Sequence, residues 1–337
     1  MDHRALSRID PELDELFQRR PPATDSTKDI LAQRQAAGDR KRALVAAAAS
    51  IPPESLAIHE RHIPTRDGTE IALRVYTPKT AAVADGRPGC FVMLHGGGFC
   101  FGDLDSEQIN CTNICKQIGL VVVNVAYRLA PEHRFPTAHN DGYDAVKWVA
   151  AHASTIGTDL SKAFILGGTS AGANIAAAIL HQARDVGLSP PLTGAWLSVP
   201  TVVSAFTVPE QYRSQFHSYE QNKDAPILSR ADLVMIYDAY RPEPESPIFS
   251  PLNYPTGHNG LPPTYFQICG MDPLRDEAFI FDHVLRECGT KTKVDVYPGL
   301  PHGFWSAYPS LSASKKRTTD SVEGARWLYD QGGRGSS

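Results

Sequence analysis

The chain has 337 residues, of which 33 are Lys or Arg and 37 are Asp or Glu, so its formal net charge is −4. This balance excludes a nucleic-acid-binding protein held by bulk positive charge, because such domains carry a strongly basic surface. A hydrophobic fraction of 42% with 21% charged residues is typical of a globular chain rather than a disordered one. The length is compatible with one domain or two.

Residues 1–58 are expected to form a helical segment outside the main domain. Apolar residues recur at helical spacing between Leu6 and Phe17, and a second helical stretch is expected from Thr27 to Ala49. The N-terminus has no secretory pattern, and no apolar run approaches the roughly 18 residues of a membrane span. We therefore expect a cytoplasmic protein without stable membrane insertion, whose six cysteines are free thiols.

From residue 59 onward the pattern predicts an α/β fold. A strand hairpin with its turn at 66–69 comes first, and short apolar runs then alternate with amphipathic helical stretches. The expected strands lie at 90–94, 120–126, 163–167, 194–199, 264–269 and 293–297. Such alternation is typical of a mainly parallel sheet with helices on both faces, in which ligands bind at the carboxyl ends of the strands.

Residues 201–247 interrupt this alternation, since they are rich in Tyr, Phe, Pro and charge and show no clear strand. We interpret them as an insertion that forms a cap together with residues 1–58. The core would then consist of residues 59–200 and 248–330. Residues 331–337, rich in Gly and Ser, are expected to be a flexible tail.

The strand expected at 163–167 leads directly into Gly168-Thr169-Ser170-Ala171-Gly172 and then into a helix. A serine on such a sharp strand-to-helix turn is exposed for nucleophilic attack, and its neighbours two positions away must be small. The N-terminus of the following helix favours the negative charge that forms there. We therefore predict Ser170 as a catalytic nucleophile.

A second motif, His95-Gly96-Gly97-Gly98-Phe99, directly follows the strand at 90–94. A glycine run after a strand exposes backbone N–H groups, which can stabilise the oxyanion of an acyl-transfer reaction. Gly96, Gly97 and Ala171 are the expected donors. A phosphate-binding loop is disfavoured, because no Gly-Lys-Ser/Thr follows and the dinucleotide-binding spacing is absent.

A nucleophilic serine needs a general base and an acidic residue that orients this base. Where the serine lies on such a strand-to-helix turn, the three residues occur along the chain in the order Ser, then Asp or Glu, then His. His302 follows the strand at 293–297 and Asp272 follows the strand at 264–269, so both are expected at the same sheet edge as Ser170. Asp276 and Glu277 remain alternatives for the acid, although both would serve equally well as charges at a helix N-terminus.

These motifs resemble the hormone-sensitive-lipase-like family of α/β-hydrolases, which includes many esterases and carboxylesterases. The residues that carry the resemblance are 95–99, 102–105, 127–136, 168–172, 272–276 and 302–304. The resemblance implies an eight-stranded hydrolase core with a helical cap, and ester hydrolysis without a cofactor or metal. Thr169 stands where many members carry Asp, and Ala173 replaces a frequent glycine.

The expected function is a serine carboxylesterase that cleaves small to medium, partly apolar esters or lactones through an acyl-enzyme. Its partner would be a small-molecule ester, and a homodimer is compatible with the sequence. Aromatic residues expected to line the substrate pocket are Phe99, Phe101, Phe206, Phe216 and Tyr219. The alternative is a non-hydrolytic enzyme of secondary metabolism, catalysing acyl transfer, cyclisation or elimination with the same triad. A small-molecule receptor is disfavoured, because His302 is in place.

Overall fold

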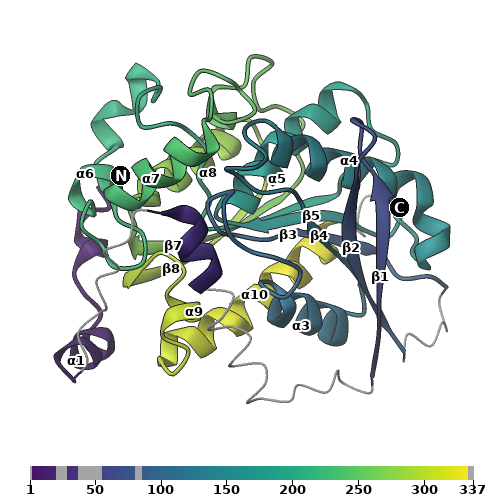
Figure 1. Cartoon of the computed structure of the whole chain (residues 1–337), viewed down its shortest axis with the longest axis horizontal. Helices are drawn as coiled ribbons and strands as arrows, with labels where there is room; N and C mark the ends of the chain where they lie inside the picture. The colour runs from purple at the N-terminus through teal and green to yellow at the C-terminus, as the bar shows by residue number, and fades with distance from the viewer. Residues whose placement is uncertain (1, 20–28, 37–54, 80–85, 333–337) are drawn as a thin grey trace.

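An eight-stranded sheet forms the centre of the protein, in the order β1-β2-β4-β3-β5-β6-β7-β8. The computed structural model describes residues 2–19, 29–36, 55–79 and 86–332 (Figure 1). β2 pairs antiparallel with both β1 and β4, whereas all other neighbouring strands are parallel. The strands are Leu56–Pro64 (β1), Glu70–Pro78 (β2), Cys90–Leu94 (β3), Val121–Ala126 (β4), Phe164–Thr169 (β5), Gly194–Ser198 (β6), Thr264–Met271 (β7) and Thr292–Pro301 (β8). The predicted α/β class and the mainly parallel eight-stranded sheet are confirmed.

Helices cover both faces of this sheet (Figure 1). Val92 and Leu94 of β3 pack in the cluster that includes α4, α5 and α8, while Phe91 and Met93 pack against α3 and α10. Because both faces are buried, the central strands are apolar throughout rather than alternating. The helices are Gln108–Ile118 (α3), Thr137–His152 (α4), Ala171–Asp185 (α5), Arg275–Glu287 (α8) and Ser312–Gly332 (α10).

The N-terminal segment contains a short 3₁₀ turn, Arg4–Ser7, followed by α1 at Pro11–Arg19. The Asp10 amide donates to the Gly299 carbonyl oxygen at 3.1 Å, which fastens this segment beside β8. Residues 30–36 are helical, as expected, and the rest of the helix predicted from Thr27 to Ala49 lies outside the described residues.

The expected insertion, residues 201–247, holds the 3₁₀ helix Glu210–Gln215 (η3), the short helix Ser218–Gln221 (α6) and the longer helix Arg230–Tyr240 (α7). None of its residues, all of which the structure describes, lies in a strand. Ser229 caps α7 in a reciprocal capping box with Asp232, which explains why the helix begins there.

Two predicted boundaries differ from the structure. β1 begins at Leu56, three residues inside the segment 1–58, because Leu56 is buried and pairs with Pro78 across the hairpin. α10 continues to Gly332, so residues 331 and 332 are helical rather than part of a tail. The remaining tail residues, 333–337, lie outside the described part of the chain.

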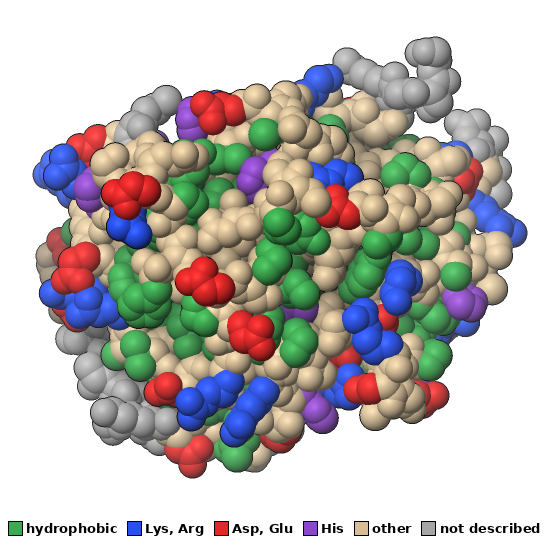
Figure 2. Space-filling view, turned by 90° about the horizontal axis from the view of Figure 1, so that it is seen from above, with side chains coloured by type: hydrophobic (Ala, Val, Ile, Leu, Met, Phe, Trp, Pro, Cys, Tyr) green, Lys and Arg blue, Asp and Glu red, His purple; other side chains and the backbone are tan. Residues whose placement is uncertain are grey.

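The surface carries no broad field of one sign on the face shown in Figure 2, where acidic and basic side chains are interspersed with apolar ones. Within the described ranges, no helix combines the length and apolar character that crossing a membrane requires. All six cysteines, which fall inside these ranges, are free thiols.

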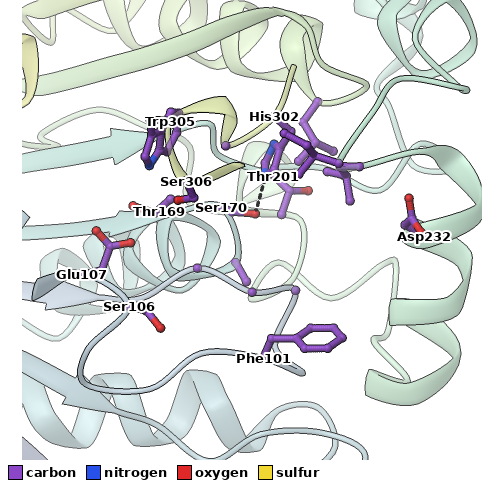
Figure 3. A pocket seen from close by; sticks show the side chains of 18 of the residues that line it. Phe101, Ser106, Glu107, Thr169, Ser170, Thr201, Asp232, His302, Trp305 and Ser306 are labelled. Atoms are coloured by element: carbon purple, nitrogen blue, oxygen red, sulfur yellow. Dashed lines mark hydrogen bonds between the residues drawn. The ribbon is translucent and has the colours of Figure 1, made fainter. Parts of the chain in front are cut away.

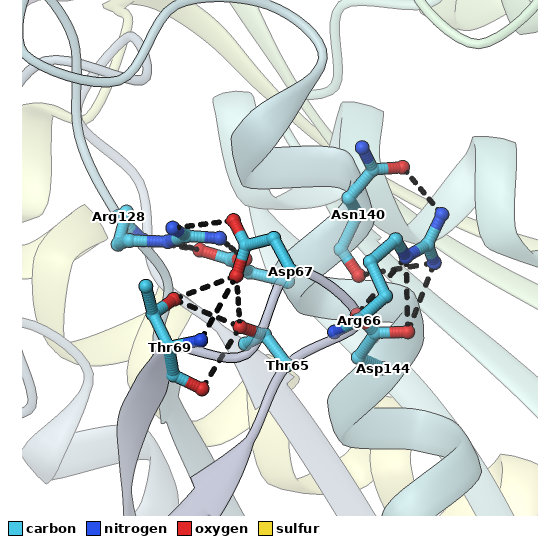
Figure 4. Close-up of polar contacts among 8 residues, drawn as sticks. Thr65, Arg66, Asp67, Thr69, Arg128, Asn140 and Asp144 are labelled. Atoms are coloured by element: carbon cyan, nitrogen blue, oxygen red, sulfur yellow. Dashed lines mark hydrogen bonds and ion pairs between the residues drawn. The ribbon is translucent and has the colours of Figure 1, made fainter.

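The β1–β2 hairpin is fixed to α4 by ion pairs at its turn (Figure 4). Arg66 donates to Asp144 at 3.0 Å, and Arg128 bridges Asp67 at 2.8 Å and Asp141 at 2.7 Å. Asp141 is fully buried, and it also accepts the backbone amide of Arg128 at 2.9 Å. The segment that leaves β4 is therefore held at both the hairpin and α4.

We expect Asp141→Ala to lower the free energy of unfolding by about 3 kcal/mol, because Arg128 loses its buried carboxylate partner, and its backbone amide loses its acceptor. Urea denaturation followed by circular dichroism measures this change. Glu15→Gln is the control, since the pair of Glu15 with Arg19 is exposed and its loss should leave the midpoint unchanged. Equal midpoints for the parent and Asp141→Ala would contradict the assigned role.

Candidate active site

Ser170 lies on a tight turn between β5 and α5, with backbone angles φ 53° and ψ −116°. A positive φ is strained for a serine and persists only where the surroundings enforce it. A Cβ added to Gly168 would lie 2.2 Å from the Gly172 carbonyl carbon, and one added to Gly172 would lie 2.2 Å from the Leu94 carbonyl oxygen. The Ser170 amide donates to the Ser198 carbonyl oxygen at 2.8 Å. The turn is thus clamped between β3 and β6.

A chain of hydrogen bonds links Ser170, His302 and Asp272. His302 Nε2 lies 2.9 Å from Ser170 Oγ, and His302 Nδ1 lies 2.7 Å from Asp272 Oδ2 (Figure 3 draws the first bond). Asp272 follows β7 and His302 follows β8, so the parallel strands bring both to the edge where β5 ends. Asp272 is 1% exposed, and its second oxygen accepts the Leu274 amide at 2.8 Å.

The two alternative acids face elsewhere. Asp276 accepts the backbone amides of His217 and Ser218 at 2.7 Å each. Glu277 Oε2 accepts the amides of Val202 and Val203 at 2.8 Å each, and burial raises the pKa of Glu277 to about 8. Both carboxyls therefore hold the insertion against α8, which leaves Asp272 as the partner of His302.

The glycine loop after β3 packs directly on the nucleophile turn. A Cβ on Gly96 would lie 3.1 Å from the Thr169 carbonyl oxygen and 3.6 Å from the Ser170 Cβ. Gly97 has φ +122°, and a Cβ there would lie 2.3 Å from the Phe101 carbonyl oxygen. Only glycine fits at Gly97, as the motif predicted. The loop therefore packs against the Ser170 turn, and Ala171 follows Ser170 at the start of α5.

The Tyr127–Glu132 segment supports this loop from behind. The Tyr127 hydroxyl donates to the His95 carbonyl oxygen at 2.7 Å, and the Ala130 amide donates to the Phe99 carbonyl oxygen at 2.9 Å. Glu132 pairs with Arg34 of the N-terminal segment at 2.8 Å. These contacts give the segment a structural role next to the glycine loop.

Arg34 connects the N-terminal segment to the glycine loop itself. Its Nε donates to the Cys100 carbonyl oxygen at 2.7 Å, and its guanidinium also reaches the Ala130 carbonyl oxygen. A single arginine therefore links three segments that are distant in sequence.

A cavity of about 780 Å³ opens beside Ser170. Apolar side chains of the insertion form one side, and polar groups near α3 and the α10 N-terminus form the other. In Figure 3, Asp232 lies on one side of the Ser170–His302 pair, and Glu107 and Trp305 lie on the other. The apolar lining includes Phe101, Ile227, Leu228, Leu233, Met235, Ile236, Tyr237 and Leu274.

Three of the five aromatic residues predicted to line the pocket do not line this cavity. Phe206 is 80% exposed, and Phe216 stacks on Tyr219 with ring centroids 6.4 Å apart. Phe101 lines the cavity as predicted. Phe99 also borders it, although its ring is buried and stacks on Tyr240 at 4.1 Å.

Leu233 and Ile236 of α7, which line the cavity, were not predicted individually. Leu233, Ile236 and Tyr237 follow the i, i+3, i+4 spacing that marks one face of a helix, and this signal identifies the wall in retrospect. The motif included Gly98, but its proximity to α7 was not predicted: Gly98 has φ +58°, and a Cβ there would lie 2.7 Å from Ile236 Cδ1. The third glycine of the loop thus makes room for α7.

Residues 91–306 match a family model described as alpha/beta hydrolase fold. AB hydrolase superfamily protein B1A11.02 of Schizosaccharomyces pombe is 39% identical over 323 residues, which cover 96% of this chain and 94% of that protein. Versiconal hemiacetal acetate esterase of Dothistroma septosporum is 36% identical over 239 residues, which cover 70% and 72%. The crystal structure of a vibralactone cyclase superimposes with a TM-score of 0.90 at 31% sequence identity, covering 97% of each chain.

Gly172→Ala should prevent Ser170 from reaching its position, because the added Cβ would overlap the Leu94 carbonyl oxygen. We expect the rate of Ser170 labelling by a fluorophosphonate to fall by at least about a hundredfold, because a small misplacement of a reacting group has a cost of this size. Ala173→Gly is the matched control one residue away, since it removes a methyl group and adds no atom. Parent-like labelling of Gly172→Ala would disprove the tight turn.

Proposed function

Because the chain belongs to the α/β-hydrolase-fold family, in its hormone-sensitive-lipase-like branch, we propose that it is a serine carboxylesterase acting on small to medium, partly apolar esters or lactones. The observation that carries this proposal is the hydrogen-bonded chain from Ser170 through His302 to Asp272 beside a cavity. The similarity to an esterase over 70% of the chain supports it.

In the proposed mechanism, Ser170 Oγ attacks the ester carbonyl carbon while His302 Nε2 takes the hydroxyl proton. Asp272 accepts a hydrogen bond from Nδ1–H of His302. This bond fixes the tautomer of the imidazole and stabilises the imidazolium that forms. The proton then passes from His302 to the leaving alkoxide, so that an alcohol departs and an acyl-enzyme remains. Water, deprotonated by His302, hydrolyses the acyl-enzyme and restores Ser170.

The negative charge on the carbonyl oxygen would be stabilised by backbone amides at the nucleophile turn. Gly97 and Ala171 are the donors we propose, since they flank Ser170 in the loop and at the start of α5. We propose Gly96, the third predicted donor, as well, since it packs against the Ser170 turn.

The substrate would bind under a cap made of residues 1–58 and 201–247, on a core of residues 59–200 and 248–330. Gln33 and α7 line the cavity, which supports a contribution from both cap segments. The apolar α7 wall favours an apolar part of the substrate, and the cavity volume suits a small or medium ester.

We also propose that the protein is cytoplasmic and forms a homodimer. Six unpaired cysteines support a reducing compartment such as the cytoplasm. β1 and β8 are the outer strands of the sheet, and an outer strand can pair with a second copy, which supports a homodimer.

A second candidate function is non-hydrolytic chemistry on the same triad, such as cyclisation or acyl transfer. Its specific support is the superposition on a vibralactone cyclase over 97% of the chain. In that case the acyl group would pass to a hydroxyl of the substrate rather than to water.

We expect Ser170→Ala to lower kcat on p-nitrophenyl butyrate by about ten-thousandfold or more, since the nucleophile is lost. Asp272→Asn should lower kcat strongly as well, because His302 would lose its orienting carboxylate. Spectrophotometric release of p-nitrophenol measures both. Asp276→Asn is the control for the triad acid, and an activity loss in this variant as deep as in Asp272→Asn would reverse the assignment.

Product analysis separates the two candidate functions. With a hydroxy-ester substrate, a hydrolase releases the free acid, whereas a cyclase or transferase gives a lactone or a new ester of unchanged oxidation state. We expect free acid as the main product by liquid chromatography and mass spectrometry. A parent enzyme that is labelled at Ser170 yet yields only lactone or transferred ester would establish the second function.

A further inference from the structure

Trp305 is a partly buried aromatic residue that lines the cavity and has no part in the proposed mechanism. It follows His302 closely in the chain, in the short helix Phe304–Ala307 (α9). In Figure 3 it lies on the side of the Ser170–His302 pair that is opposite Asp232 of α7. Because a large aromatic side chain dominates the contacts of a site that it borders, its surroundings indicate what kind of group binds there.

The indole of Trp305 is held in a fixed orientation by a buried arginine. The Arg317 guanidinium lies 3.9 Å from the centroid of the indole, in a cation–π contact, and Arg317 is 2% exposed. Arg317 Nη1 donates to Asn110 Oδ1 at 3.1 Å, and Arg317 Nη2 donates to Ser198 Oγ at 3.2 Å. The Phe304 ring meets the indole edge-on, with centroids 5.3 Å apart. A ring fixed in this way loses little conformational freedom when a substrate binds.

The cavity wall around Trp305 is polar, unlike the wall that α7 forms. Its hydroxyl-bearing, amide and charged residues come from α3, α9, α10 and the turn before α3, and they include Ser106, Asn110, Ser306, Ser314, Lys315 and Thr318. An aliphatic chain would gain little from such a wall. A planar ring that carries oxygen atoms can instead stack on the indole and form hydrogen bonds at its edge. The chemistry of this wall therefore favours a polar aromatic group.

The two walls lie on opposite sides of the reacting ester, because its carbonyl carbon must lie at Ser170. After the first step the acyl group stays bound to Ser170, whereas the alcohol receives a proton and leaves. On the side of Trp305 the lining residues Ser306 and Lys315 are exposed to solvent, whereas Leu233 of the α7 wall is buried. The group that departs first therefore fits the side of Trp305, and the acyl group fits the α7 wall.

We propose that Trp305 is a specificity-determining residue, whose indole stacks on an aromatic alcohol group of the substrate. The substrate class is then an ester of a phenol. Ser170 Oγ forms a bond to the carbonyl carbon, the bond from that carbon to the phenolic oxygen breaks, and His302 supplies the proton with which the phenol leaves. The inference rests on the proposed function, because it presupposes that Ser170 attacks an ester.

The test compares phenyl butyrate with trifluoroethyl butyrate, which share the acyl group, while the alcohol of the second ester has no ring. We expect Trp305→Ala to lower kcat/KM on phenyl butyrate by about tenfold, the size of one lost stacking contact, and on trifluoroethyl butyrate by less than about twofold. Trp305→Phe should retain most of the parent's kcat/KM on the phenyl ester, because it keeps a ring. Chromatographic quantitation of butyric acid measures the hydrolysis of both esters.

Trp148→Ala is the matched control, because Trp148 is also partly buried but stacks on His152 in α4, away from the cavity lining. It should leave the ratio of the two kcat/KM values unchanged. A folded Trp305→Ala that loses activity on both esters equally, or on neither, would overturn the proposal, and so would a Trp305→Phe variant with the substrate preference of Trp305→Ala. If Trp305→Ala does not fold, Trp305→Leu replaces it, since leucine keeps apolar bulk without a ring, and the same outcomes decide.

Failure of the proposed function gives a different pattern, because organophosphates can label Ser170 even if the parent hydrolyses no ester. Diethyl nitrophenyl phosphate and diethyl fluorophosphate leave the same diethylphosphoryl group on Ser170 and differ only in the group that departs. We expect Trp305→Ala to slow labelling by the nitrophenyl compound about tenfold and by the fluoride less than about twofold, as measured by mass spectrometry. Equal effects on both labelling rates would refute the role of Trp305 by themselves, and a parent that neither compound labels would overturn the function and the inference together.

Discussion

The strained turn at Ser170 is the constraint on which the rest of the site depends. A serine with positive φ is unfavourable by itself, so neighbouring segments must enforce it. The Leu94 carbonyl oxygen leaves no room for a Cβ at Gly172, and the Ser198 carbonyl oxygen holds the Ser170 amide. β3, β5 and β6 must therefore be adjacent, which is the parallel order that the sheet provides. The same order places the ends of β7 and β8, with Asp272 and His302, within reach of Ser170.

Much of this arrangement could be predicted because its signals are local. Apolar runs alternating with helices predict a parallel sheet, and parallel strands end at one edge. Ser170, Asp272 and His302 each directly follow an expected strand, so their convergence required no knowledge of side-chain packing. Gly97 and Gly168 could likewise be predicted from their motifs. In the structure, a side chain at either position would collide with the backbone.

The substrate side was less predictable because it depends on contacts between distant segments. Phe206, Phe216 and Tyr219 belong to the insertion, and composition alone does not tell whether an aromatic ring faces a cavity, a neighbour or solvent. Local patterns thus predicted the reacting groups, while the residues around them required the folded chain.

The link made by Arg34 has a consequence for how such enzymes diversify. Segments that select a substrate usually change faster than the strands that carry the reacting groups. Here the N-terminal segment, which we propose as part of the cap, donates a hydrogen bond from Arg34 to the carbonyl oxygen of Cys100, next to the glycine loop, and pairs with Glu132. A cap transplanted from a relative would therefore disturb the catalytic loop unless the arginine and its acceptors travelled with it. The proposed cap and the glycine loop are thus connected parts of one unit in this chain, rather than separate modules.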